Sequence, residues 1–186
     1  MTLKRILGAL ALATPALALA HTGDGMLHEH GFFAGFLHPL TGADHLAAML
    51  AVGLWSALAR RGRWILLAPA SFAGALLLGA LAGMAGLGLP MVEPLVAVSV
   101  LVLGLMAAAR WHLGAAPAGA LVGGFALCHG LAHGAELQGY DALAGMVVAT
   151  VLLHAVGIML GLKLSPRLAQ GAGAGIALLG LALVIA

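Results

Sequence analysis

Charged and aromatic residues are scarce in this sequence. Only 8% of the 186 residues are charged and 5% are aromatic, whereas 63% are hydrophobic and the mean hydropathy is +1.13. Soluble domains average about 25% charged residues, so this composition excludes a soluble enzyme and a nucleic-acid-binding domain. It predicts an all-α integral membrane protein, in which abundant glycine and alanine let helices approach closely.

Two further absences narrow the possibilities. The single cysteine, Cys128, excludes an internal disulfide, so cysteine pairing carries no information on the redox compartment. The sequence also lacks a glycine-rich phosphate-binding loop of the Walker type. The chain is therefore not expected to hydrolyse ATP, and no ATPase subunit is evident as a partner.

The first twenty residues are typical of a cleaved signal peptide. Lys4 and Arg5 precede a short apolar run, and Ala18 and Ala20 fit the small-residue rule for cleavage. The run is too short to span a bilayer. Residues 1–20 are therefore predicted to be removed, so that the mature chain starts at His21 outside the membrane.

Residues 21–31 form a histidine-rich segment, beginning HTGDGMLHEH, that is predicted to be periplasmic. His21 and its free amino group are candidates for capturing metal outside the membrane. A flexible polar tail is an equally good interpretation, because a short histidine-rich tract is only compositional evidence.

Residues 32–186 are predicted to form one transmembrane domain of six helices, at about 20 residues per span. The apolar segments cover residues 32–59, 64–85, 92–109, 118–137, 142–162 and 168–186. With the mature amino terminus outside, the first, third and fifth breaks between segments face the cytoplasm. These breaks hold every basic residue of the mature chain: Arg60, Arg61, Arg63, Arg110, Lys163 and Arg167. The positive-inside rule is obeyed, and both mature termini are predicted to be periplasmic.

Ionisable residues interrupt three of the predicted spans. They are His38, Asp44 and His45 within HPLTGADH, His129, His133 and Glu136 within CHGLAHGAEL, and His154 in the fifth span. Such residues are costly at membrane depth unless they are paired, hydrated or bound to a ligand, so they mark function more often than packing. Imidazoles with carboxylates suit Ni²⁺, Co²⁺, Zn²⁺ or Cu²⁺, and they predict a path for a transition metal.

Helical spacing predicts how these side chains are arranged. His38 and His45 are seven residues apart, and His129, His133 and Glu136 follow positions i, i+4 and i+7, so each set is expected on one face of one helix. Counted inward from the outer helix ends, the histidines fall at two depths: His45, His129 and His154 near the middle, and His38 and His133 about two turns further out. We expect a ladder of two levels that leads inward.

Three alternatives stay open at this point. Pro39 and Gly42 predict local unwinding of the first span around His38, with freed carbonyls available to a cation. Asp44 is either a direct ligand or a residue that orients a histidine ring through its second nitrogen. His154, taken alone, is as good a candidate for a hydrogen bond between helices as for a ligand.

The sequence HPLTGADH matches the HPxxGxDH pattern of the HupE/UreJ family of nickel and cobalt permeases, and nearly the whole chain resembles that family. The resemblance implies a secondary transporter, not an enzyme, in the bacterial inner membrane. Its substrate would be Ni²⁺ or Co²⁺ for hydrogenase, urease or cobalamin synthesis, with the bilayer as the other partner and no cofactor. The family's motif residues fall here on His38, Asp44, His45, His129, His133 and Glu136.

Two other classes of protein would also use these histidines. A zinc-dependent intramembrane hydrolase would use Asp44 or Glu136 as the base that activates a zinc-bound water. A haem protein would use facing histidines as axial ligands. Neither explains the outer acidic residues and the histidine-rich start as directly as cation entry does. The donor set does not separate nickel from cobalt, and Zn²⁺ also fits it.

Overall fold

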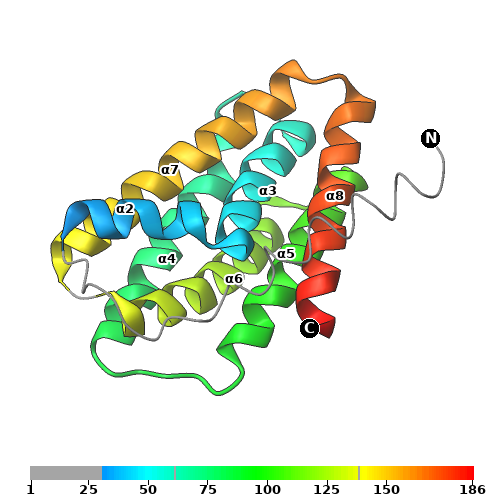
Figure 1. Cartoon of the computed structure of the whole chain (residues 1–186). Coiled ribbons are helices and arrows are strands. Elements are labelled where there is room, and N and C mark those ends of the chain that lie inside the picture. Colours follow the sequence, from blue (N-terminus) through cyan, green and yellow to red (C-terminus); the bar gives the residue numbers. More distant parts are fainter. Residues whose placement is uncertain (1–30, 61, 138) are drawn as a thin grey trace.

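The computed structural model describes residues 31–60, 62–137 and 139–186, and all regular structure within these ranges is helical. The helices are α2 (Phe32–Thr41), α3 (Ala43–Ala59), the 3₁₀ turn η1 (Gly62–Leu66), α4 (Leu67–Met84), α5 (Val92–Ala108), α6 (Ala115–Glu136), α7 (Tyr140–Lys163) and α8 (Pro166–Ile185) (Figure 1). The predicted signal peptide, His21 and almost all of the histidine-rich segment lie outside the described residues.

Each of the six predicted apolar segments contains a helix, so the all-α class is confirmed. Four helices are long and apolar enough to cross a membrane: η1 with α4, then α6, α7 and α8. The bent pair of α2 and α3 makes a fifth candidate if it counts as one span. The remaining helix, α5, is apolar but has only 17 residues.

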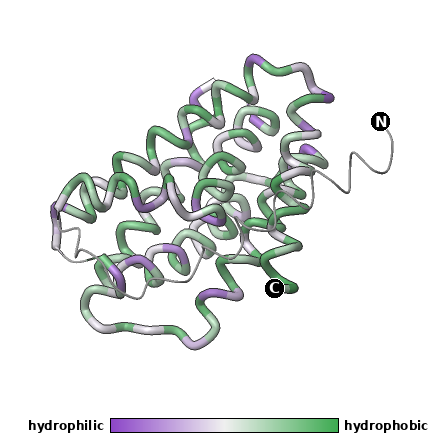
Figure 2. The backbone as a smooth tube through the Cα atoms, in the orientation of Figure 1, coloured by the Kyte–Doolittle hydropathy of each residue, from purple (hydrophilic) through white to green (hydrophobic). Residues whose placement is uncertain are grey.

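The outside of the bundle is hydrophobic. Large apolar side chains are well exposed on several helices, among them Leu78 on α4, Leu162 on α7 and Leu178 on α8. Most positions along the helices are hydrophobic, and hydrophilic residues are confined to short stretches (Figure 2). Exposed leucines of this number suit a lipid environment, where apolar side chains face hydrocarbon and the helices satisfy their own backbone groups.

Helices approach one another through glycine. The most extensive pairings are α4 with α6, α5 with α8, and α3 and α2 with α7. At the contact of α2 with α7, a Cβ atom added at Gly35 would overlap the backbone carbonyl of Ala142, and one added at Gly145 would overlap the carbonyl of Phe32. Without a hydrophobic driving force between helices in lipid, such close backbone contacts supply much of the packing energy.

Gly42 breaks the first predicted span into two helices that meet at 83°. Its extended backbone (φ −80°, ψ 116°) ends α2 and begins α3, whereas Pro39 lies inside α2. The carbonyl of His38 accepts hydrogen bonds from the amide of Gly42 (3.3 Å) and the hydroxyl of Thr41 (3.0 Å). The first span is therefore broken as predicted, but the break is at Gly42 and not around His38, where the carbonyl is already bonded.

We expect Gly35→Ala to lower the free energy of unfolding by about 1–3 kcal/mol, because its methyl group must push α2 away from α7. The matched control is Gly124→Ala, since a Cβ at Gly124 has open space around it. Unfolding of the purified protein in mixed detergent micelles measures both. Equal stability of the two variants would contradict the close contact between α2 and α7.

Candidate metal site

Four imidazole rings from three helices meet in one group. They are His38 of α2, His45 of α3, and His129 and His133 of α6. The ring centres lie 4.3 Å apart for His38 and His133, 3.8 Å for His45 and His133, and 4.7 Å for His45 and His129. The structure thus brings together the histidines of the first and fourth predicted spans.

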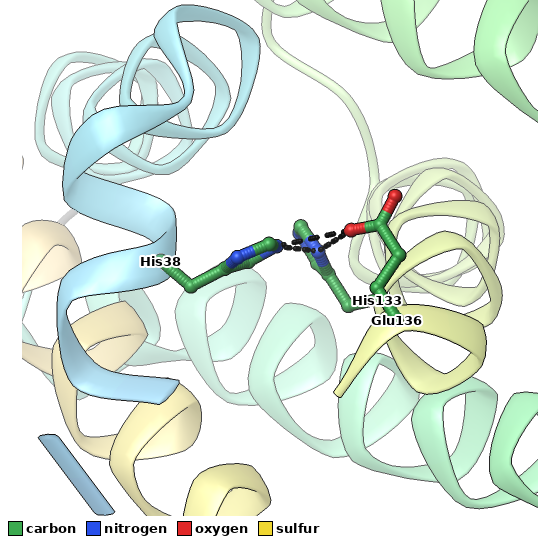
Figure 3. Close-up of side chains that lie close together, drawn as sticks. All are labelled: His38, His133 and Glu136. Atoms are coloured by element: carbon green, nitrogen blue, oxygen red, sulfur yellow. Dashed lines mark hydrogen bonds and ion pairs between the residues drawn. The ribbon is translucent and has the colours of Figure 1, made fainter. Parts of the chain in front are cut away.

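The outer part of the group consists of His38, His133 and Glu136. Nε2 of His38 lies 2.5 Å from Nδ1 of His133 and 3.3 Å from Oε2 of Glu136. Oε2 of Glu136 is also 3.7 Å from Nδ1 of His133. One nitrogen or oxygen of each residue lies within 4.8 Å of the other two, an arrangement that can hold a metal ion. Figure 3 shows His38 reaching across from α2 toward the other two side chains on α6.

Asp44 fixes the ring of His45. Its Oδ1 accepts hydrogen bonds from the backbone nitrogen and from Nδ1 of His45, each at 2.8 Å. Because an ionised carboxylate only accepts, Nδ1 of the neutral ring carries the hydrogen and Nε2 carries the lone pair. Nε2 is buried and has no hydrogen-bond partner among the described residues, so it is available to a metal ion.

Ser99 of α5 fixes the ring of His129 in the same way. The Ser99 hydroxyl donates to the carbonyl of Val96 (2.7 Å), and its oxygen lies 2.7 Å from Nε2 of His129. A hydroxyl has one hydrogen, so Nε2 must donate to the serine oxygen and the lone pair of the neutral ring lies on Nδ1. That Nδ1 is also buried without a partner in the described part of the chain.

His154 of α7 lies apart from the group. The ring of Phe72, on α4, lies near both His129 and His154: its centre is 5.6 Å from that of His129 and 5.2 Å from that of His154. Neither ring nitrogen of His154 has a hydrogen-bond partner among the described residues. The structure therefore gives no support to a hydrogen bond between helices at His154, and its role as a ligand stays a prediction.

Exposure is high at one end of the group and low at the other. The side chain of Glu136 is 61% exposed and that of His38 is 31% exposed, whereas that of His133 is 3% exposed. His129 is fully buried. The arrangement is a row of nitrogen donors that starts at the surface, beside a carboxylate, and ends inside the bundle.

The spacing rule gave an incomplete picture of this site. His38 and His45 do not share one face of a continuous helix, because the chain turns at Gly42, yet their ring centres are only 6.4 Å apart. The contribution of Ser99 was not foreseen. Its signal was available, since it is a lone hydroxyl in the apolar run LVAVSVLVL, a context in which a polar side chain needs a partner.

A family model described as HupE / UreJ protein matches residues 9–183. The chain belongs to this family. It is also similar to Protein HupE from Rhizobium leguminosarum bv. viciae, with 41% identity over 186 residues that cover 94% of each chain. No solved structure matches it. The resemblance carried by HPLTGADH is confirmed, and membership of the HupE / UreJ family together with the apolar helices makes this a multi-pass membrane protein.

We expect Ser99→Ala to weaken binding of Ni²⁺ by about 10- to 100-fold, because the alanine leaves the His129 ring without the bond that sets its tautomer. Ser99→Thr keeps the hydroxyl and is expected to restore binding. Calorimetric titration of the purified protein with Ni²⁺ measures both variants. Unchanged affinity in Ser99→Ala would show that His129 needs no such support.

Proposed function

We propose that this protein is a secondary permease that takes up Ni²⁺ or Co²⁺ across the bacterial inner membrane for metalloenzymes such as hydrogenase or urease, or for cobalamin synthesis. One observation carries the proposal. Four histidines and a carboxylate lie together within helices of an apolar bundle, and three of the rings leave a buried nitrogen with no partner in the described part of the chain. Unpaired polar atoms of this kind are costly unless a ligand engages them.

The chemistry of the donors favours late divalent transition metals. Imidazole nitrogens with one or two carboxylates suit Ni²⁺, Co²⁺ and Zn²⁺, whereas Ca²⁺ and Mg²⁺ prefer oxygen ligands. The metal is the substrate here and passes along the donors. In this interpretation His38, His133 and Glu136 form the first binding position, and Asp44 orients His45 instead of ligating.

The gradient of exposure supports a direction of movement. Glu136 is the most exposed member of the group and its carboxylate attracts cations from outside. Further in, the donors are imidazole rings, and the ion exchanges one ring for the next as it moves. An inward-negative membrane potential favours entry by about 2.3 kcal/mol per charge per 100 mV, which makes uptake possible without ATP.

The proposal includes six spans and periplasmic termini. Helix α5, with 17 residues, is about 26 Å long at 1.5 Å per residue, near the ~30 Å hydrocarbon core of a bilayer. Counting it and the bent pair α2–α3 as spans gives six. Such a count puts every basic residue after residue 20 on one side, which is the cytoplasmic side by the positive-inside rule.

We expect His45→Ala to reduce accumulation of radiolabelled Ni²⁺ and Co²⁺ to the level of cells that lack the protein, because the ring links the outer donors to His129. The cells are to lack permeases of their own, with expression matched by immunoblot of membranes. His112→Ala, which removes an exposed histidine outside the group, is the matched control and is expected to transport normally. Full uptake by His45→Ala would remove this residue from the transport path, and no uptake by an inserted wild type would contradict the permease.

We also expect alkaline phosphatase fused after Ala186 to be active in intact cells, since the enzyme folds only in the periplasm. A fusion after Arg63 is expected to be inactive, because the first break between spans would be cytoplasmic. Activity measured on whole cells at equal fusion abundance tests both. The reverse pattern, or equal activity, would contradict the six-span topology.

A further inference from the structure

The most extensive helix contacts between the two halves of the chain form a symmetric set. α3 packs on α7 and α4 packs on α6, while α5 and α8 pack on each other. Suppose that α3, α4 and α5 correspond in order to α6, α7 and α8. The contact of α3 with α7 is then equivalent to that of α6 with α4, and the contact of α5 with α8 is equivalent to itself. Because each half contributes three helices, equivalent helices run in opposite directions, as in inverted repeats of transporters.

The individual backbone contacts obey the same correspondence. A Cβ atom at Gly53 of α3 would overlap the carbonyl of His154 on α7, and one at Gly130 of α6 would overlap the carbonyl of Leu76 on α4. Under this correspondence Gly53 is equivalent to Gly130, and the carbonyl of His154 is equivalent to that of Leu76. Each glycine therefore approaches the equivalent carbonyl in its own pair of helices.

Four further glycine contacts agree. Gly157 of α7 lies against the carbonyl of Leu50, and Gly79 of α4 lies against the carbonyl of Leu127. In the self-paired helices, a Cβ at Gly104 of α5 would meet the backbone of Ala177, and one at Gly180 of α8 would meet the backbone of Leu101. Residue numbers of equivalent positions differ by nearly the same amount throughout, so these contacts follow the pattern of an inverted duplication.

The duplication assigns a counterpart at the other end of the bundle to each buried ring of the metal site. The counterparts are Val52 for His129, Ser56 for His133 and Val122 for His45. All three are fully buried. The outer end thus carries ligands and is partly open, whereas the equivalent inner end carries almost no ligands and is closed.

Hydrogen bonds hold the inner end closed. Nε1 of Trp55 donates to the carbonyl of Trp111 (2.8 Å), and Nη2 of Arg60 donates to the carbonyl of Leu113 (2.9 Å). The hydroxyl of Ser56 donates to the carbonyl of Ile65, in η1. The first two bonds tie the end of α3 to the segment between α5 and α6, and the third ties it to η1.

The two halves differ in their first helix. The chain bends by 83° at Gly42 before α3, whereas α6 is one uninterrupted helix through the equivalent residue, Gly119. An inverted duplication whose halves hold different conformations has a second state of similar packing, in which the halves exchange those conformations.

We propose that the structure is the outward-facing state of the permease and that exchange between the halves opens an inner passage past Val52, Ser56 and Val122. This inference rests on the proposed uptake of Ni²⁺ or Co²⁺. Since the inner counterparts of the histidines are two valines and a serine, the passage offers the ion only weak ligands and releases it to the cytoplasm.

Single-cysteine variants test the passage. Cys128→Ser removes the native thiol, and Ser56→Cys or Val122→Cys then places one thiol in the proposed passage. Val100→Cys is the control, because Val100 is equally buried but lies in the contact between α5 and α8. Inside-out membrane vesicles loaded with Ni²⁺ are treated with a membrane-impermeant thiol reagent, and the modification rate is compared with that of metal-free vesicles.

We expect both passage positions to be modified in metal-free vesicles about tenfold or more faster than Val100→Cys, because the second state exposes them to the cytoplasmic face. We expect Ni²⁺ to lower that rate, because the ion favours the outward-facing state that binds it more tightly. Only variants that accumulate Ni²⁺ in cells are compared. A result at one of the two passage positions is enough to test the proposal. If the passage cysteine of a transporting variant is modified no faster than that of Val100→Cys, the proposed passage is overturned. The proposed permease function is not affected by that result. Absence of Ni²⁺ accumulation by the wild type would instead overturn the proposed function.

Discussion

The right-angled turn at Gly42 is the constraint on which the metal site depends. It lets α2 lie against α7 through Gly35 while α3 turns into the bundle, so that His38 and His45 approach His133 from two helices. A Cβ at Gly42 would stand 3.1 Å from Oδ1 of Asp44 and 3.2 Å from Nδ1 of His45. Glycine is needed here for space beside the Asp44–His45 pair, since its backbone angles are ordinary.

A second principle governs the chemistry of the rings. Each of His45 and His129 has one nitrogen tied to a neighbour and one buried nitrogen without a partner among the described residues. Leaving a buried polar atom unpaired costs about 1–3 kcal/mol, so a stable bundle does not accumulate such atoms without a purpose. Asp44 and Ser99 each bond one ring nitrogen of a histidine, so the lone pair lies on the other nitrogen. Hydrogen bonds of this kind commonly orient the histidines that bind metals.

Much of the fold was predictable from hydropathy, because a run of about 20 apolar residues has few alternatives to a helix in lipid. All six apolar segments are helical in the structure, and the histidines of HPLTGADH and CHGLAHGAEL do meet. The turn at Gly42 was misplaced, because spacing rules assume a continuous helix. The packing of His154 against Phe72 and the role of Ser99 depend on contacts between distant helices, which local periodicity does not encode.

The most direct test of the metal site is X-ray absorption spectroscopy of the purified protein loaded with one equivalent of Ni²⁺. We expect the multiple-scattering pattern of at least two imidazole ligands together with oxygen, and no sulfur in the coordination sphere. Loss of the imidazole pattern in a variant that lacks His38 and His133 would assign the ligands to this group. A spectrum with only oxygen ligands, or with sulfur from Cys128, would contradict the site.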